Sequence, residues 1–510
     1  LSLNRSSHAL TMAEPPEQPP RAPIVRHGGE TRAGRRPGDR RVRVASRPPT
    51  ARVTLPKLGV QNPRLSRLSP AGVFVLGFAA FILAGTLLLI LPISSATGQW
   101  SSPLDALFTA TSAVCVTGLI VQDTGTYWSL FGQVVIIALI QLGGLGFMTS
   151  STLLLLLIGR RAGLRHRMIQ REAIGGEGLG STLTLTRQIA LFTLGAEALG
   201  AVILTASFWD DVGPQRAVWW GIFHAISAFN NAGFDLIGGF RSLVPFNQEP
   251  AILLTVAVLI ILGGISFAVV ADFYENRHAI WKRRSLRLAL DTRLVLLTTA
   301  GLLVFGTLTL LFTEWTNPAT FGALNFEQRL LNAFFHSVSA RSAGFTAVEI
   351  GSMREDSLLI LVALMFIGGS ATSTAGGIKV QTFSLLFFAI VSSIRGSLEV
   401  ESFQRRVPTT DLLRAISIAL LAIFLIFVAT TSLSQTEPFK VLPVLFESVS
   451  ALGTTGWTTG ITTDLTAGGR WILIVAMFVG RLGPLTLFLA LAARERPQRY
   501  QWPEERVKLG

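Results

Sequence analysis

The sequence predicts an all-α polytopic membrane protein in which four membrane–pore-loop–membrane repeats surround one pore, with eight spans and four re-entrant pore helices. Three observations predict this class. The chain is strongly apolar, one short motif recurs four times before an apolar run, and basic residues gather in alternate loops. Because these observations are independent of one another, their agreement favours a single architecture.

The composition indicates a membrane protein. Of the 510 residues, 50% are hydrophobic, and the mean hydropathy is +0.51. Apolar runs at residues 71–92, 131–158, 252–270 and 415–433 reach the roughly 20 residues that a helix needs to cross a bilayer. The single cysteine, Cys115, excludes an internal disulfide and a cysteine-based metal site. We therefore expect a multi-pass protein of the plasma membrane.

Residues 1–69 differ in composition from the rest of the chain. They hold 14 Lys and Arg residues against four Asp and Glu residues, with several proline pairs and no apolar period. These features are typical of a disordered basic arm, here expected in the cytoplasm. Beside a membrane domain, anionic lipid is a better partner for such an arm than nucleic acid.

An aromatic residue, a serine, an alanine and a glycine recur in this order four times. The copies are Phe108-Ser112-Ala113-Gly118, Phe223-Ser227-Ala228-Gly233, Phe335-Ser339-Ala340-Gly344 and Phe446-Ser450-Ala451-Gly456. A second landmark follows each copy: Gly143-Gly144, Gly263-Gly264, Gly368-Gly369 and Gly480-Arg481. Such self-similarity dictates architecture. It predicts repeats at residues 70–159, 187–276, 291–395 and 410–495 and a cytoplasmic tail at 496–510. Four equivalent units can surround one axis, which is the geometry of an ion pore.

The loop charges predict the orientation of the repeats. Lys and Arg gather at residues 160–171, 277–293, 395–414 and 494–499. The loops at residues 93–103 and 119–130 contain neither. Because cytoplasmic loops collect Lys and Arg, we expect both termini inside and the glycine segments entering from outside.

The segments that precede the glycines are too short to span a membrane. Residues 104–113 and 327–340, for example, have the roughly 10–14 residues typical of re-entrant pieces, and irregular backbone at this depth must be buried or line water. Four such strands would turn carbonyls and negative helix-dipole ends toward one cation. Glycine permits the positive φ that such backbone adopts. For any one glycine, close helix packing is the alternative; the fourfold recurrence favours a selectivity filter.

Longer motifs resemble a known family. Residues 365–379, Met-Phe-Ile-Gly-Gly-Ser-Ala-Thr-Ser-Thr-Ala-Gly-Gly-Ile-Lys, resemble the signature of the Trk/Ktr/HKT superfamily of cation transporters. Residues 478–486 and 112–119 are most similar to its KtrB branch, and the resemblance covers roughly residues 70–495. It implies one potassium pathway with filter residues Val116, Thr117, Gly118, Asn231, Ala232, Gly233, Ser342, Ala343, Gly344, Thr454, Thr455 and Gly456. In plant relatives a serine at the first filter glycine accompanies sodium selectivity, so Gly118 implies potassium. A sodium or mixed sodium/potassium transporter of the same fold is the alternative.

Two features are not repeated fourfold and predict control of the pathway. The first is the Gly/Ser/Thr-rich break at residues 368–377, which contains Gly368, Gly369, Gly376 and Gly377. Irregular backbone at that depth should lie under the filter and be able to move, and the resemblance implies an intramembrane loop that gates the pore. A helix kink for packing is the alternative, whereas a phosphate loop is excluded because no Gly-Lys-Ser/Thr follows.

The second feature is Arg481, which takes the place of a landmark glycine in an apolar span. An arginine there is energetically expensive and faces a polar cavity or partner. Below the filter its charge would repel cations, and its donors could hold the carbonyls or hydroxyls of the loop. It matches the arginine that the family places below its filter. A structural pairing with Glu447 is the alternative.

Other polar residues have simpler interpretations. His224 and His336 occupy equivalent positions, where the other repeats have Thr109 and Glu447, and the repeat symmetry argues against a shared metal site. Four polar residues beside the filter glycines either tune the filter or form buried turn hydrogen bonds: Asn230, Asn231, Ser342 and Thr455. Cys115 is expected to be a small packed residue.

The predicted function is potassium uptake through a gated pore that is driven by the membrane potential. Inverted repeats, which would indicate a midplane solute transporter, are not found, and the spans lack the paired carboxylates or nucleophile–base sets of an enzyme. The chain therefore needs no cofactor of its own. The resemblance implies a homodimer on a cytosolic, KtrA-like ring of Rossmann-type subunits that bind ATP or ADP, and uptake that sodium enhances.

Overall fold

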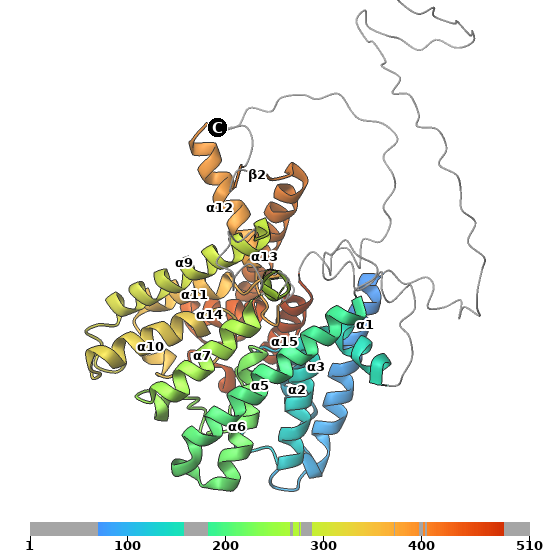
Figure 1. Cartoon of the computed structure of the whole chain (residues 1–510). Helices are drawn as coiled ribbons and strands as arrows, with labels where there is room; N and C mark the ends of the chain where they lie inside the picture. Colours follow the sequence, from blue (N-terminus) through green and yellow to red (C-terminus); the bar gives the residue numbers. More distant parts are fainter. Residues whose placement is uncertain are drawn as a thin grey trace, which may run out of the picture. The chain divides into compact units, whose positions relative to one another are not determined.

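The computed structural model describes residues 70–157, 182–265, 269–274, 276, 288–371, 373–396, 401–402 and 405–483 (Figure 1). By its contacts the chain divides into Leu1–Asn62 and Pro63–Gly510, and every described residue belongs to the second unit. The predicted arm at residues 1–69, the tail at 496–510 and the basic segments at 160–171 and 277–287 lie outside the described residues.

The first residues of each motif copy lie on a short helix of 12–16 residues that is flanked by two other helices. The first two repeats contain α1 (Pro70–Ile90), α2 (Pro103–Val114), α3 (Leu130–Leu157), α5 (Thr182–Val212), α6 (Pro214–Phe229) and α7 (Pro250–Gly264). The last two contain α9 (Leu290–Thr313), α10 (Phe326–Ser339), α11 (Glu355–Phe366), α12 (Val380–Ile394), α13 (Thr409–Thr436), α14 (Val441–Gly453) and α15 (Ala467–Leu482). The minor elements are η2 (Pro92–Ser94), η3 (Val244–Phe246), η4 (Ile350–Ser352), η5 (Thr462–Asp464) and an antiparallel pair of β1 (Glu401–Ser402) and β2 (Arg405–Arg406). The described chain is mostly helical, as predicted.

The short helices begin at strong local signals. Pro103 and Pro214 occupy the first turns of α2 and α6, where the missing N–H of proline has no intrahelical partner to lose. Helix α10 begins with a capping box, in which the Asn325 side chain accepts a hydrogen bond from the Gln328 backbone and the Gln328 side chain accepts one in return. These signals fix where three of the four motif-bearing helices begin, and hence where their glycine ends lie.

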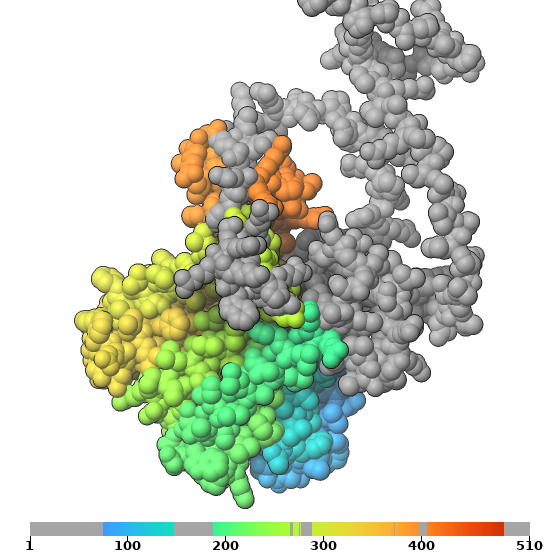
Figure 2. Space-filling model, in the orientation of Figure 1, coloured from blue at the N-terminus to red at the C-terminus, as the bar shows by residue number. Residues whose placement is uncertain are grey.

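The repeats pack in a closed cycle. The helix that follows each motif packs on the motif helix of the next repeat: α3 on α6, α7 on α10, α11 on α14 and α15 on α2. Figures 1 and 2 show the blue first repeat beside the green second and the green second beside the yellow third. The buried cluster around Phe108 includes Leu473 and Met477 of α15. The last repeat therefore closes on the first.

Within the described residues, three helical stretches are long and apolar enough to cross a membrane. They are Arg187–Val212 of α5, Leu290–Thr313 of α9 and Thr409–Thr436 of α13. Each carries large exposed apolar side chains, such as Leu199, Leu308 and Leu420. Extended apolar surface of this kind indicates contact with lipid rather than with water.

Candidate functional site

The four motif glycines follow the ends of the four short helices, and the motif serines hold the backbone there. The residue before each glycine donates its N–H to the carbonyl oxygen of the serine: Thr117 to Ser112 (2.8 Å), Ala232 to Ser227 (2.8 Å), Ala343 to Ser339 (3.1 Å) and Thr455 to Ser450 (2.8 Å). The recurring serine therefore marks a recurring turn. The third repeat is one residue shorter between serine and glycine than the others.

The sign of the backbone φ angle alternates along these turns. Two residues before each glycine, φ is positive: Val116 (54°), Asn231 (59°), Ser342 (70°) and Thr454 (47°). The glycines follow with φ of 91° at Gly118, 71° at Gly233, 83° at Gly344 and 91° at Gly456. Positive φ at β-branched Val116 and Thr454 is strained. Such strain, about 1–3 kcal/mol for each residue, persists where surrounding structure enforces it and is common at functional sites.

The four glycines form a closed ring. A Cβ added to any of them would come closer than 3.0 Å to a carbonyl oxygen of the neighbouring repeat: Gly118 to Ala232, Gly233 to Ala343, Gly344 to Thr455 and Gly456 to Thr117. The last of these contacts returns to the first repeat, so the backbones of all four repeats converge on one point. The structure thus brings together the twelve residues that the sequence assigned to a filter. The hydroxyls of Thr117 and Thr455 are buried there and make no hydrogen bond to the described residues.

Motif side chains anchor the ring in two ways. In the first and fourth repeats, Ser112 Oγ and Ser450 Oγ accept the N–H of the motif glycine at 3.0 and 3.1 Å. In the second and third repeats, Ser227 Oγ and Ser339 Oγ instead donate to the carbonyls of Phe234 and Phe345 at 2.7 and 2.6 Å. Both arrangements tie the segment after the helix back to the helix itself.

The two histidines support the same segments. Nδ1 of His224 lies 2.7 Å from the Trp220 carbonyl, and Nδ1 of His336 lies 2.8 Å from the Asn332 carbonyl. Their Nε2 atoms accept backbone N–H groups that follow the glycines, Leu236 at 3.5 Å and Ala347 at 3.2 Å. When Nδ1 donates, both nitrogens of each imidazole are hydrogen-bonded to backbone groups. This fits the structural interpretation of these histidines.

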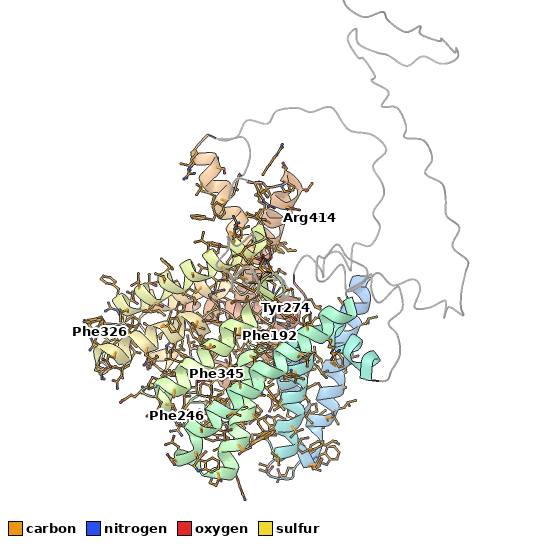
Figure 3. All side chains as sticks on the ribbon, viewed as in Figure 1. Phe192, Phe246, Tyr274, Phe326, Phe345 and Arg414 are labelled. Carbon is orange, nitrogen blue, oxygen red and sulfur yellow. The ribbon has the colours of Figure 1, made fainter. Side chains whose placement is uncertain are left out.

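The third and fourth repeats are joined beside the ring. Phe345, labelled in Figure 3, directly follows Gly344 and is fully buried. Its carbonyl accepts hydrogen bonds from Ser339 Oγ and, at 3.0 Å, from Trp457 Nε1 of the fourth repeat. Asn230, by contrast, turns away from the ring and donates to Gln141 Oε1 (2.8 Å) and Glu197 Oε1 (3.0 Å). Asn230 is thus a buried turn residue, and Cys115 is a buried free thiol, as expected.

The landmark glycines lie against the ends of the motif helices. A Cβ on Gly143, Gly263 or Gly480 would come closer than 3.0 Å to the carbonyl of Val114, Phe229 or Leu452, respectively. Each is a carbonyl in the last turn of the motif helix of the same repeat. Any side chain here would push the two helices apart. The third repeat is different, because Gly368 lies against the carbonyl of Gly376 within the loop at residues 368–377.

This loop separates α11 from α12 as an extended irregular segment, so a simple helix kink is the wrong interpretation. It is bound to the second repeat, since Thr374 Oγ1 donates to the carbonyl of Gly263 (2.8 Å) and Ser370 N donates to that of Gly264 (3.0 Å). It also contacts the ring, because Gly376 N donates to Ser342 Oγ at 2.8 Å. Ser342 Oγ is in turn 2.8 Å from the Thr454 carbonyl.

Arg481 joins the loop to the first repeat. Its Nη1 donates to the Thr374 carbonyl at 2.5 Å, and its Nη2 donates to the Gly143 carbonyl at 2.6 Å. The alternative pairing with Glu447 is wrong, since that carboxylate accepts hydrogen bonds from the hydroxyls of Thr458 and Thr462. The expected partner of Arg481, a carbonyl of the Gly-rich loop, is the one observed.

Sequence reasoning missed two supporting residues. Lys379 Nζ donates to the Ala375 carbonyl at 2.6 Å, so a second cation holds the loop. Its position at the end of the Gly-rich motif was the only signal.

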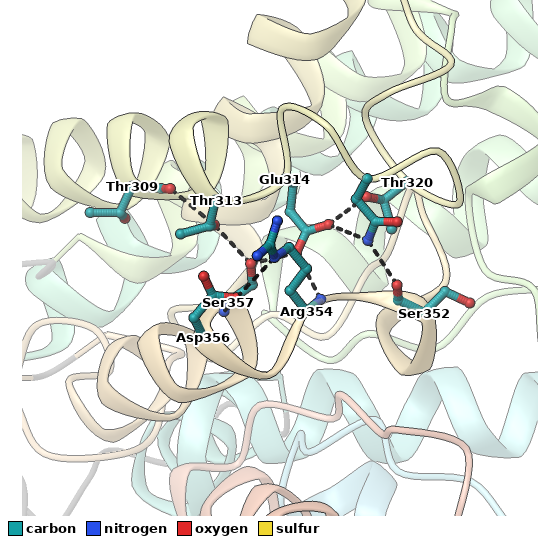
Figure 4. A network of polar contacts seen from close by, with 9 residues as sticks. Thr309, Thr313, Glu314, Thr320, Ser352, Arg354, Asp356 and Ser357 are labelled. Atoms are coloured by element: carbon teal, nitrogen blue, oxygen red, sulfur yellow. Dashed lines mark hydrogen bonds and ion pairs between the residues drawn. The ribbon is translucent and has the colours of Figure 1, made fainter.

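Glu314, at the end of α9, is the second residue and is fully buried. It accepts hydrogen bonds from the Arg354 backbone (2.9 Å) and from Thr320 (2.5 Å), Asn317 and Ser357 (Figure 4). It fixes the loop that precedes α11.

The chain combines a ring of backbone carbonyls at the ends of buried helices with lipid-facing helices. This combination is typical of membrane proteins that transport cations. The TrkH cation transport protein family matches residues 75–502, and the chain belongs to this family.

Several relatives and a solved structure are similar over most of their lengths. The chain is 38% identical to the Ktr system potassium uptake protein B of Bacillus subtilis, covering 87% of this chain and 97% of that protein. It is 40% identical to the protein of the same name from Vibrio alginolyticus (86% and 94% covered) and 36% identical to the potassium/sodium uptake protein NtpJ of Enterococcus hirae (87% and 98%). The crystal structure of the potassium transporter TrkH from Vibrio parahaemolyticus has the same fold, with a TM-score of 0.65 at 20% identity over 84% of this chain and 86% of that one.

Proposed function

We propose that this chain is the pore-forming subunit of a potassium uptake system of the plasma membrane. Its four repeats, at residues 70–159, 187–276, 291–395 and 410–495, supply eight spans and four re-entrant helices, with both termini in the cytoplasm. One observation carries the proposal: the filter glycine of each repeat meets a carbonyl of the next until the ring closes. The printed names of the two Ktr relatives support potassium as the ion.

The ring accounts for translocation. A potassium ion enters from outside along the membrane potential and exchanges its hydration water for backbone carbonyl oxygens at the twelve ring residues. The four short helices direct their negative ends toward the ion, which stabilises it further. Because hydrogen bonds to Ser112 and its three counterparts hold these turns, the carbonyls keep their positions when the ion leaves.

The loop beneath the ring accounts for gating. Gly368, Gly369, Gly376 and Gly377 give it backbone freedom, and Arg481 closes it by a bond to the Thr374 carbonyl. The chain forms a homodimer on a cytosolic Rossmann-type ring, and this ring binds ATP or ADP and moves the loop. Sodium enhances uptake. The word "system" in the names of the Ktr relatives supports such a partner subunit.

A sodium or mixed sodium/potassium transporter is the second candidate. The observation that favours it is the similarity to NtpJ, which is named a potassium/sodium uptake protein. Glycine rather than serine at residue 118 favours potassium.

Radioactive rubidium uptake into proteoliposomes with a negative interior potential tests the proposal. We expect uptake that potassium blocks and sodium does not. If the purified chain shows no rubidium uptake, the cytosolic partner is added to the same vesicles. Two results would contradict the proposed selectivity: no rubidium uptake in the presence of this partner, or stronger inhibition of uptake by sodium than by potassium.

A further inference from the structure

A cavity of about 240 Å³ lies beside the loop, between α12, α13, α14 and α15. Its walls are mainly apolar and include Ile378, Ile418, Ala422 and Leu452. Two cationic side chains, Lys379 and Arg481, also line it. The cavity therefore combines an apolar body with a positively charged end, and none of the twelve ring residues lines it.

One wall of the cavity is a lipid-facing helix. Ala422 of α13 is buried and lines the cavity. Leu420 and Phe427 of the same helix are 62% and 66% exposed, as expected of residues in contact with acyl chains. Ile418 and Ile426, which also line the cavity, are partly exposed. A molecule dissolved in the bilayer can thus reach the cavity along α13.

The cations of this cavity lack a counter-anion in the described part of the chain. The hydrogen bonds of Lys379 and Arg481 go to carbonyls of Ala375, Thr374 and Gly143, which are neutral groups. Two charges at membrane depth without a carboxylate are unfavourable. Each side chain keeps further donors, because a lysine has three and an arginine five.

We propose that this cavity binds a single-chain anionic amphiphile of the bilayer, namely a fatty-acid carboxylate. The carboxylate accepts hydrogen bonds from Lys379 and Arg481, and the first part of the chain lies between Ile418, Ala422 and Leu452. Charge complementarity selects the anionic head. The volume of about 240 Å³ is below the roughly 300–1,000 Å³ of sites for drug-sized ligands, so it holds the head and only the first part of one chain.

The same two cations connect this site to the gate. Arg481 and Lys379 bind the carbonyls of Thr374 and Ala375, which are consecutive residues of the loop. A carboxylate is a stronger acceptor for a cation than a neutral carbonyl. It therefore competes with the loop for these donors, loosens the loop and increases ion flux. This consequence rests on the proposed function, whereas binding itself does not.

Binding is tested with an oleate analogue that carries a photoreactive diazirine, in proteoliposomes of the full chain. We expect labelling of the α12–α13 walls of the cavity, identified by mass spectrometry. Ile418→Phe fills the cavity and should abolish labelling, and Ala422→Leu is a second filling variant if the first does not fold. Leu420→Phe, the same change on the exposed face of α13, is the matched control and should label normally. Labelling that both filling variants retain would overturn the site.

Flux is measured in the same vesicles as rubidium uptake with oleate or oleyl alcohol. We expect oleate to raise uptake roughly 10–10²-fold, the factor that corresponds to loss of one charge-assisted hydrogen bond. Oleyl alcohol and the Ile418→Phe variant should show no such rise. An equal effect of the alcohol would overturn the proposal, because it would indicate a bilayer effect. Labelling without any rubidium uptake, even with the cytosolic partner, would contradict the proposed function and leave the binding site established.

Discussion

Substitution of Arg481 separates two effects that this side chain combines beneath the glycine ring, namely its charge and its two hydrogen bonds. The guanidinium binds the carbonyls of Thr374 and Gly143 at 2.5 and 2.6 Å. A hydrogen bond to a charged group contributes about 1.5–3 kcal/mol. Only the bond to Thr374 reaches the loop directly, so it contributes about 1.5–3 kcal/mol to the closed loop, and the bond to Gly143 holds the guanidinium in place. Since about 1.4 kcal/mol is a factor of ten, loss of the Thr374 bond shifts the opening equilibrium by roughly 10–10².

Two variants separate the contribution of the charge from that of the hydrogen bonds. Arg481→Gln removes the charge and keeps at most one weaker bond, so rubidium flux at zero regulator should rise at least tenfold, up to the limit of a fully open pore. Arg481→Lys keeps the charge, but a compact ammonium cannot reproduce the planar fork that spans both carbonyls. Its flux should lie between those of the parent protein and Arg481→Gln if the bonds hold the gate.

The matched control is Arg470 of the same helix, which pairs with Asp105 at 2.7 Å and does not contact the loop. Arg470→Gln should leave the response of flux to the regulator unchanged. Folded Arg481→Gln protein with unaltered flux and unaltered regulation would refute the reasoning and reduce Arg481 to a structural residue.

Three further predictions follow from the ring, the loop and the network of Figure 4. Gly118→Ser, at φ 91° and against the Ala232 carbonyl, should raise sodium permeation relative to potassium in competition assays; unchanged selectivity would remove this glycine from the filter. Deletion of residues 371–376 should leave a constitutively open pore, whereas a folded but inactive protein would show that the loop supports the conducting state. Glu314→Gln should destabilise the protein by about 1–3 kcal/mol, seen as a lower Tm, with rubidium uptake per folded molecule unchanged; an unaltered Tm would contradict the assigned anchoring.

The sequence predicts those features of the site that are local in the chain. A turn that needs positive φ and leaves little room for a Cβ favours glycine, and Gly118 and its three counterparts were recognisable because the same aromatic, serine and alanine precede each of them. Arg481 was recognisable because a charge in an apolar span requires a polar partner. The Gly-rich motif indicated that a carbonyl of the loop would be one partner. The second partner, the Gly143 carbonyl, was not predictable, because Gly143 lies 338 residues earlier in the chain.

Features that depend on packing between distant segments were not predictable. The landmark glycines recur visibly, but their reason is a carbonyl of the motif helix, such as Val114 for Gly143, and only the folded chain brings these together. Lys379 was missed for a similar reason. A lysine that follows a membrane segment has many ordinary explanations, and its bond to Ala375 depends on how the loop folds back.

The arrangement also favours the third repeat as the place of the proposed gate. In the other repeats the landmark glycine packs directly on its own motif helix, as Gly263 does on Phe229, and this contact fixes the span. In the third repeat Gly368 packs on the loop instead, so the span is not fixed by its own repeat.

Besides bonds within the third repeat, such as Gly376 N to Ser342 Oγ, the loop is held by the other repeats. Its bonds go to Gly263 and Gly264 of the second repeat and, through Arg481 of the fourth, to Gly143 of the first. These contacts share one short segment, and loss of one exposes the others to competition from water. They should therefore break together rather than singly, which gives the loop two discrete positions and lets a perturbation at any neighbouring repeat shift the balance between them.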